Sequence, residues 1–154
     1  VVGDKEWVEM KKLVGIWLDH RQAWVVSLLR DYPGQVDDKE MIEGIQSNVE
    51  RRVRLSGGAR TRKTPYGPQD IAVDGKQEAR IKSQLKPYYK KILERVIDAD
   101  QVLVFGPGEA KIEFRKAAEK SERLAEKIRK IETADKMSVK QIAARVRKFF
   151  LSHS

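Results

Sequence analysis

The sequence predicts a single α/β domain, and three observations carry this prediction. Two apolar runs, 13–18 and 23–29, flank a polar turn and are rich in Val, Ile, Leu and Trp, as the strands of an antiparallel hairpin are. A short apolar run, 102–105, leads through Gly-Pro-Gly into a helical pattern, which is the strand-turn-helix unit of layered α/β folds. A chain of 154 residues is long enough for one core of this kind.

Between these elements the pattern is weaker. A third strand is expected in the polar segment 39–55, because apolar residues and arginines alternate over 52–55. Residues 56–75 hold mainly Gly, Pro, Thr, Arg and Lys, so we expect a long exposed loop that adds little to the core. A helix should follow, kinked or restarted by Pro87, with an apolar face made by Ile81, Leu85, Tyr88, Tyr89, Ile92 and Val96.

The sequence pattern in the last third of the chain predicts two helices and a strand. Glu109 lies in the first turn of the helix that follows Gly-Pro-Gly, where a carboxylate suits the helix dipole. Residues 128–133 are expected to form a further strand. Ser138 and Gln141 have the spacing of a capping box, so a final helix should begin there and pack through Val139, Ile142, Ala143, Val146, Phe149 and Phe150.

Composition indicates the kind of partner and compartment. Lys and Arg outnumber Asp and Glu by 32 to 23, and the net charge of +9 favours anionic partners. The absence of cysteine excludes disulfide and thiolate chemistry and suits a reducing compartment, so we expect a cytoplasmic protein. The longest apolar run is too short to cross a bilayer, and no membrane partner is expected. The domain should span 12–151, with 1–11 an N-terminal extension or expression remnant.

The order of elements resembles the middle domain of archaeal and eukaryotic class-1 peptide-chain release factors and of the ribosome-rescue factor Pelota, over residues 12–150. The motifs VGIWLD at 14–19 and AWVV at 23–26 resemble the opening hairpin of that domain. VFGPG at 104–108, with Lys111 in the helix, resembles its strand-to-turn segment. A group of small bacterial release-factor-like proteins is also similar. The resemblance implies a ribonuclease-H-like fold, a mixed sheet of about five strands with helices packed on it.

The exposed loop departs from the release-factor pattern at one position. In the release factors the loop carries Gly-Gly-Gln, which places water for peptidyl-tRNA hydrolysis. Here the loop reads Ser56-Gly57-Gly58-Ala59-Arg60, so both glycines are present and alanine stands where the glutamine would be. Pelota-like proteins also lack the catalytic motif yet bind ribosomes. The resemblance therefore implies a protein that binds RNA or the ribosome but lacks the catalytic glutamine.

Basic residues gather on both sides of the two glycines. Guanidinium forks suit bidentate contact with phosphate oxygens, and glycine allows close approach of the backbone. Tyr66 offers a face on which a base could stack. The alternative is a solvated basic loop without a ligand. The residues expected to bind RNA or phosphate are Arg51, Arg52, Arg54, Gly57, Gly58, Arg60, Arg62, Lys63 and Tyr66.

A second candidate is an anion site at the helix N-terminus that follows Gly106, Pro107 and Gly108, with Lys111 nearby. The alternative is a tight strand-to-helix turn. The sequence favours the turn, because the segment is neither a P-loop nor a dinucleotide-binding fingerprint.

Metal and histidine chemistry find little support. Asp19 ends the first strand, where ribonuclease-H-like nucleases place a metal-binding carboxylate, but no second carboxylate is evident and a hairpin-turn role is favoured. His20 and His153 are the only histidines, so no triad or metal site is expected. Trp17 and Trp24 should face each other across the hairpin and lie in the core.

The sequence thus predicts a non-catalytic RNA-binding or ribosome-associated module related to translation termination and rescue factors. Ribosomal or transfer RNA is the expected partner, and no cofactor is expected. Two alternatives stay open: a hydrolase, either a peptidyl-tRNA hydrolase or a degenerate nuclease, and a protein-interaction domain with incidental charge. RNA binding that depends on salt would distinguish the RNA-binding module from the protein-interaction domain. Catalytic turnover would distinguish the hydrolase from the other two. The oligomeric state is not predicted.

Overall fold

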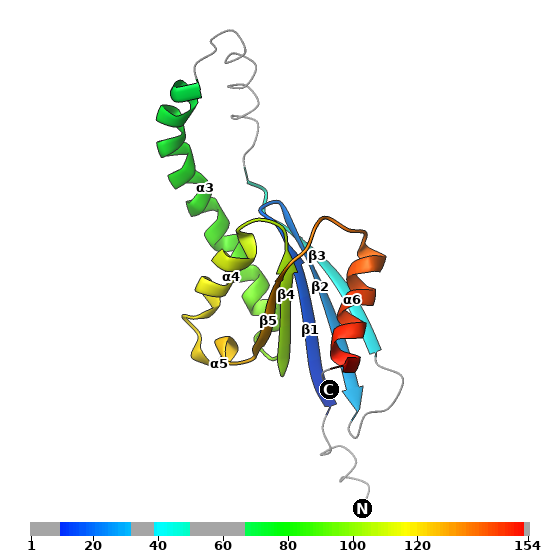
Figure 1. The fold of residues 1–154 in the computed structure, drawn as a ribbon. Coiled ribbons are helices and arrows are strands. Elements are labelled where there is room, and N and C mark those ends of the chain that lie inside the picture. The colour runs from blue at the N-terminus through cyan, green and yellow to red at the C-terminus, as the bar shows by residue number, and fades with distance from the viewer. Residues whose placement is uncertain (1–9, 32–38, 50–66, 153–154) are drawn as a thin grey trace, which may run out of the picture.

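A computed structural model describes residues 10–31, 39–49 and 67–152. They form a mixed sheet with helices packed on it (Figure 1). In chain order the elements are β1 (Met10–Leu18), β2 (Gln22–Asp31), β3 (Lys39–Gln46), α3 (Gly67–Val96), β4 (Gln101–Gly106), α4 (Ala110–Ala118), α5 (Glu122–Ala125), β5 (Ile128–Thr133) and α6 (Val139–Ser152).

The sheet has five strands in the order β3-β2-β1-β4-β5. The first three strands pair antiparallel, and the hairpin register places Trp17 opposite Trp24. Strand β4 then joins β1 in parallel, and β5 joins β4 in parallel. The expected α/β class, a mixed sheet of about five strands with helices packed on it, is confirmed, and the hairpin strand β1 lies at the centre.

Strand alternation divides the core into two layers. Val14, Ile16 and Leu18 of β1 point toward α3, α4 and α5, where they join one buried apolar cluster. Leu13 and Trp17 point to the other face and join the cluster closed by α6. Because successive side chains of a strand alternate between faces, one strand supplies both layers. Figure 1 shows α3, α4 and α5 on one side of the sheet and α6 on the other.

Helix α6 approaches the sheet closely at Gly15. A Cβ atom added at this glycine would lie 2.2 Å from a methyl carbon of Val146, so only glycine lets the helix come this near. The helix begins with the expected capping box. The Gln141 N–H donates to the Ser138 hydroxyl at 3.1 Å, and the Ser138 N–H donates to the Gln141 side-chain oxygen at 2.9 Å.

Helix α3 corrects two expectations. It begins at Gly67, so residues 67–75, expected in the exposed loop, are helical. It also continues as one helix through Pro87, so it does not restart there, and the expected alternative of a kink stays a prediction. A proline removes one backbone hydrogen bond, and side chains buried on both sides of it, among them Leu85 and Tyr88, hold the helix on the sheet.

The other element boundaries follow the sequence more closely. The third strand lies within the predicted segment, at Lys39–Gln46, whereas the alternation at 52–55 falls outside the described residues. Strand β5 occupies the predicted residues 128–133. Strand β1 begins at Met10, inside the expected extension. In the part of the chain described, no helix has the length and apolar character needed to cross a bilayer.

Candidate nucleic-acid interface

The predicted RNA-binding residues lie in a part of the chain that the structure does not describe. Residues 51–66, which include Gly57, Gly58 and Tyr66, all fall outside the described ranges. Their role in binding RNA therefore stays a prediction. The structure does show where the chain leaves the sheet before this segment and where it resumes afterwards.

The chain leaves the sheet beside the β1–β2 turn. The Ser47 hydroxyl donates to the His20 carbonyl at 2.7 Å, and the Ser47 N–H donates to the Arg21 carbonyl at 2.9 Å. Asn48 follows with a φ of 57°, a left-handed conformation that asparagine tolerates better than most residues. The chain resumes at Gly67, the first residue of α3. The predicted basic segment is thus bounded by the β1–β2 turn on one side and by α3 on the other.

Helix α3 carries a row of exposed lysines on the side away from the sheet. Lys82, Lys86 and Lys90 follow one another at intervals of four residues, which is about 6 Å along a helix axis. No ion pair joins any of the three to a carboxylate among the described residues. Residues 79–96 contain one acidic side chain, Glu94, against six basic ones: Arg80, Lys82, Lys86, Lys90, Lys91 and Arg95. The described part of α3 therefore presents a positive face.

The N-terminal part of α3 extends past the sheet at the end where β1 and β4 finish (Figure 1). A helix of 30 residues is about 45 Å long. Within 79–96, where the structure describes the side chains of this helix, the first buried one is Leu85. Lys90 therefore lies in the part of the helix that packs on the sheet. Lys82 lies nearer to the N-terminal end of the helix, which residues 51–66 precede in the chain.

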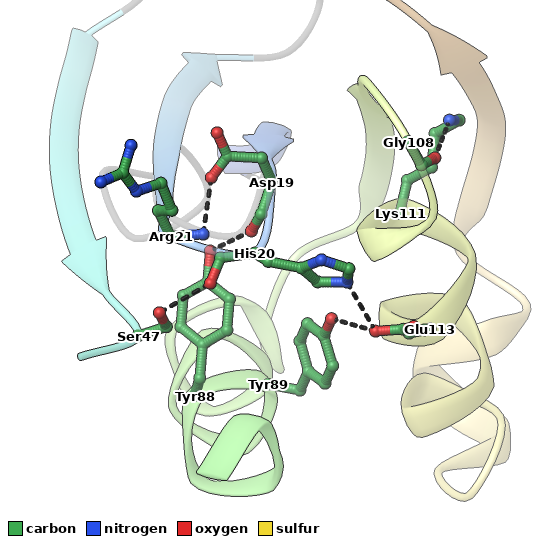
Figure 2. Close-up of polar contacts among 9 residues, drawn as sticks. All are labelled: Asp19, His20, Arg21, Ser47, Tyr88, Tyr89, Gly108, Lys111 and Glu113. Carbon is green, nitrogen blue, oxygen red and sulfur yellow. Dashed lines mark hydrogen bonds and ion pairs between the residues drawn. The ribbon is translucent and has the colours of Figure 1, made fainter. Parts of the chain in front are cut away.

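A polar cluster lies where β1 and β4 end. His20, from the β1–β2 turn, places Nε2 3.0 Å from Glu113 Oε1 on α4, and the Tyr89 hydroxyl of α3 donates to the same oxygen at 2.6 Å (Figure 2). The neighbouring Tyr88 hydroxyl donates to the Asp19 carbonyl at 2.9 Å. These bonds connect α3 and α4 to the β1–β2 turn.

The two tyrosines act as donors in this cluster. Burial raises the pKa of Tyr88, and the nearby Asp19 adds to the effect. The pKa of Tyr89 is also raised. Burial is the main cause, and the hydrogen bond to Glu113 and the negative charge of that carboxylate raise the pKa further. Both hydroxyls therefore stay protonated at any physiological pH. This gives the cluster a positioning role, because its groups hold the turn and the helices together.

The Gly-Pro-Gly turn is closed by Lys111. Lys111 is 7% exposed, and its Nζ donates to the Gly108 carbonyl at 2.5 Å. Gly108 has a φ of 64°, and a Cβ added at Gly106 would lie 2.2 Å from the Leu18 carbonyl oxygen. Glu109 occupies the N-cap position of α4 and makes no side-chain capping bond. These contacts show that Gly106, Gly108 and Lys111 form and close the turn. Anion binding at this turn stays a prediction.

Asp19 has the role of a hairpin-turn residue. Its Oδ1 accepts hydrogen bonds from the Arg21 and Gln22 backbone N–H groups, both at 2.8 Å. Within residues 10–31, 39–49 and 67–152, no group of three or more His, Cys, Asp or Glu side chains is arranged to hold a metal ion. His153 lies outside the described residues.

Sequence reasoning did not find the link between His20, Glu113 and Tyr89. The histidine was placed in a turn, the tyrosine on an apolar helix face, and the glutamate was not singled out. His20 and Glu113 are 93 positions apart in the chain, and no local pattern connects them. A tyrosine pair on a helix predicts burial, but it does not predict the partner of its hydroxyls.

Comparison with known proteins shows distant likenesses. The solved archaeal translation termination factor aRF1 shares 15% identity with this chain, over 92% of this chain and 40% of its own, with a TM-score of 0.48. Pelota from Archaeoglobus fulgidus shares 10% identity over 99% of this chain and 37% of its own, with a TM-score of 0.44. Pelota from Thermoplasma acidophilum shares 9% identity over 97% and 42%, with a TM-score of 0.46.

No family model matches the chain, and no curated protein matches it. The chain spans about two fifths of the length of aRF1 and of the two Pelota proteins. Likenesses of this size do not assign a family or an activity.

Proposed function

We propose that this protein is a non-catalytic RNA-binding module that acts in translation, with ribosomal or transfer RNA as its partner. The observation that carries the proposal is the lysine row of α3, Lys82, Lys86 and Lys90, which is exposed and makes no ion pair with a described carboxylate. This row lies on the helix that follows the predicted basic segment 51–63 in the chain, and we propose that the two form one surface. The motif resemblance to release factors and Pelota points to the same class of partner.

The two parts of this surface suit phosphate in different ways. An arginine guanidinium presents a planar fork that fits two phosphate oxygens, whereas a lysine ammonium acts as a point charge on a flexible stem. The proposed arginine sites in 51–62 would therefore orient an RNA backbone, and the α3 lysines would add attraction along its path. The excess of positive charge, +9 over the whole chain, would steer RNA toward the surface. The absence of cysteine suits the proposed cytoplasmic location.

Changing Lys82, Lys86 and Lys90 together to glutamine is expected to weaken RNA binding. If each lysine contacts one phosphate of single-stranded RNA, the slope of log affinity against log salt should become shallower by about 2. Filter binding or ribosome co-sedimentation over a salt series measures this slope. The matched control is the triple change of Lys116, Lys120 and Lys140 to glutamine, which removes the same charge from other elements. An equal loss in both variants would show a general charge effect and contradict a site on α3.

The unmodified protein is expected not to release peptide from ribosomes carrying peptidyl-tRNA. Water attack on the ester needs a donor or acceptor held within hydrogen-bond reach, and Ala59 offers only a methyl group and its backbone. Arg60 cannot serve as a base, because its guanidinium stays protonated. The measurement is release of labelled peptide, with an Ala59→Gln variant beside it. Release by the unmodified protein above the protein-free background would refute the non-catalytic proposal.

A further inference from the structure

The two edges of the sheet differ in how they are protected. At one edge, β5 is interrupted by a register shift against β4 and carries exposed Arg129 and Lys130. Bulges and charged side chains of this kind are the usual means by which proteins prevent edge strands from pairing with another chain. The other edge strand, β3, also exposes charged side chains, Lys39, Glu40 and Glu43. Unlike β5, it keeps an unbroken register with its neighbour, and it exposes two large apolar side chains, Met41 at 64% and Ile42 at 42%.

The outer edge of β3, which pairs with no other described strand, has a defined set of outward hydrogen-bonding groups. The Ser47 N–H donates to the carbonyl of Arg21, the residue directly opposite in the β2–β3 register. Bonded and non-bonded pairs alternate along an antiparallel ladder, so positions 39, 41, 43 and 45 bond toward β2. Positions 40, 42, 44 and 46 turn their N–H and C=O groups outward, and β3 is the terminal strand of the described sheet.

The side chains of β3 are complementary to a second copy of themselves. Lys39, Met41 and Glu43 share the face on which α3 packs, because residues two apart in a strand point the same way. An antiparallel pairing of two β3 strands with its two-fold axis at Met41 sets Met41 against its copy. The same register sets Lys39 opposite Glu43 of the second copy, and Glu43 opposite its Lys39. Opposite charges across strands stabilise a pair, and like charges destabilise it.

We propose that two copies of this chain associate through β3, antiparallel about a two-fold axis at Met41, to form one continuous sheet. Such an interface is isologous, as in most homodimers. The other symmetric registers fit less well. The axis at Met41 sets Ile42 opposite Glu40, but it also forms two pairs of opposite charge. An axis at Ile42 sets Met41 opposite Glu43 and forms no such pair, and an axis at Glu43 sets two glutamates against each other. The partner is thus a second copy of the chain, and the association does not depend on RNA binding.

Charge reversal tests the register. Sedimentation equilibrium of the unmodified chain should show a dimer, and Lys39→Glu or Glu43→Lys alone should raise its dissociation constant at least about tenfold, since each puts like charges opposite twice. Combining the two changes restores both pairs and should restore the dimer. Because the change at Glu43 also breaks its 2.7 Å contact with Arg95, Arg95→Gln is the control and should remain dimeric. A monomer at every concentration, or no recovery in the double variant, would overturn the proposal.

Cross-linking tests the position of the axis without relying on charge. The chain has no cysteine, so Met41→Cys supplies a single thiol. Directly opposite residues of a non-bonded antiparallel pair have Cα atoms about 4.5 Å apart, within the range that a disulfide spans. Mild oxidation should therefore give a covalent dimer of the Met41→Cys variant at a rate far above that of Gln141→Cys, which puts an exposed thiol on α6. Equal rates for the two variants would reject an axis at Met41.

Discussion

Replacing Trp17 with alanine is expected to lower the free energy of unfolding by about 3–5 kcal/mol. Trp17 lies on the central strand, is 1% exposed and packs in the cluster that α6 closes. Its indole N–H also donates to the Asp135 carbonyl at 3.2 Å, a bond that alanine cannot make. The loss combines the removed apolar surface, the cavity left behind and an unpaired carbonyl. Chemical denaturation monitored by circular dichroism measures it.

Trp24 provides the matched comparison on the same hairpin. It faces Trp17 in the register but is only partly buried, and its ring lies over Gly44 near the β3 edge. Trp24→Ala should therefore cost less, about 1–2 kcal/mol. Equal losses at the two positions would indicate that the α6 layer does not cover Trp17 as the structure shows. If each variant lost less than about 1 kcal/mol of unfolding free energy, the result would show that the hairpin does not lie in the core.

Removing the charge of the predicted basic segment is expected to have the largest effect on RNA binding. If the segment contacts about six phosphates of single-stranded RNA, log affinity should fall with log salt at a slope near −4, and the variant should lose most of this dependence. The melting temperature should change little, because the residues are expected to bury little surface. The variant replaces by glutamine Arg51, Arg52, Arg54, Arg60, Arg62 and Lys63.

The two halves of the proposed surface can be separated in the same assay. Loss of binding in the segment variant but not in the α3 variant would limit the site to residues 51–63. The reverse result would place it on the helix. Unaltered binding in both would contradict the proposed surface and move the search to other basic residues, such as Arg145. An affinity that does not depend on salt would refute phosphate contact as the mechanism.

Local sequence patterns were enough to predict the hairpin and the final helix. The apolar runs 13–18 and 23–29 around a polar turn predicted a hairpin, and the structure shows β1 and β2 there. The spacing of Ser138 and Gln141 predicted a capped final helix, and both capping bonds are present. These predictions succeed because propensity, periodicity and capping act between residues only a few positions apart.

Other features of the molecule depend on tertiary contacts, which local sequence patterns do not predict. The tertiary structure keeps Pro87 inside a continuous helix, because burial on both sides outweighs one lost hydrogen bond. It joins His20 to Glu113 across 93 positions of the chain, and it sets Gly106 against the Leu18 carbonyl. It also decides which strands end the sheet, and so which edge exposes Met41. Such contacts depend on how strands pair and helices pack, and residues distant in sequence carry no local signal of meeting.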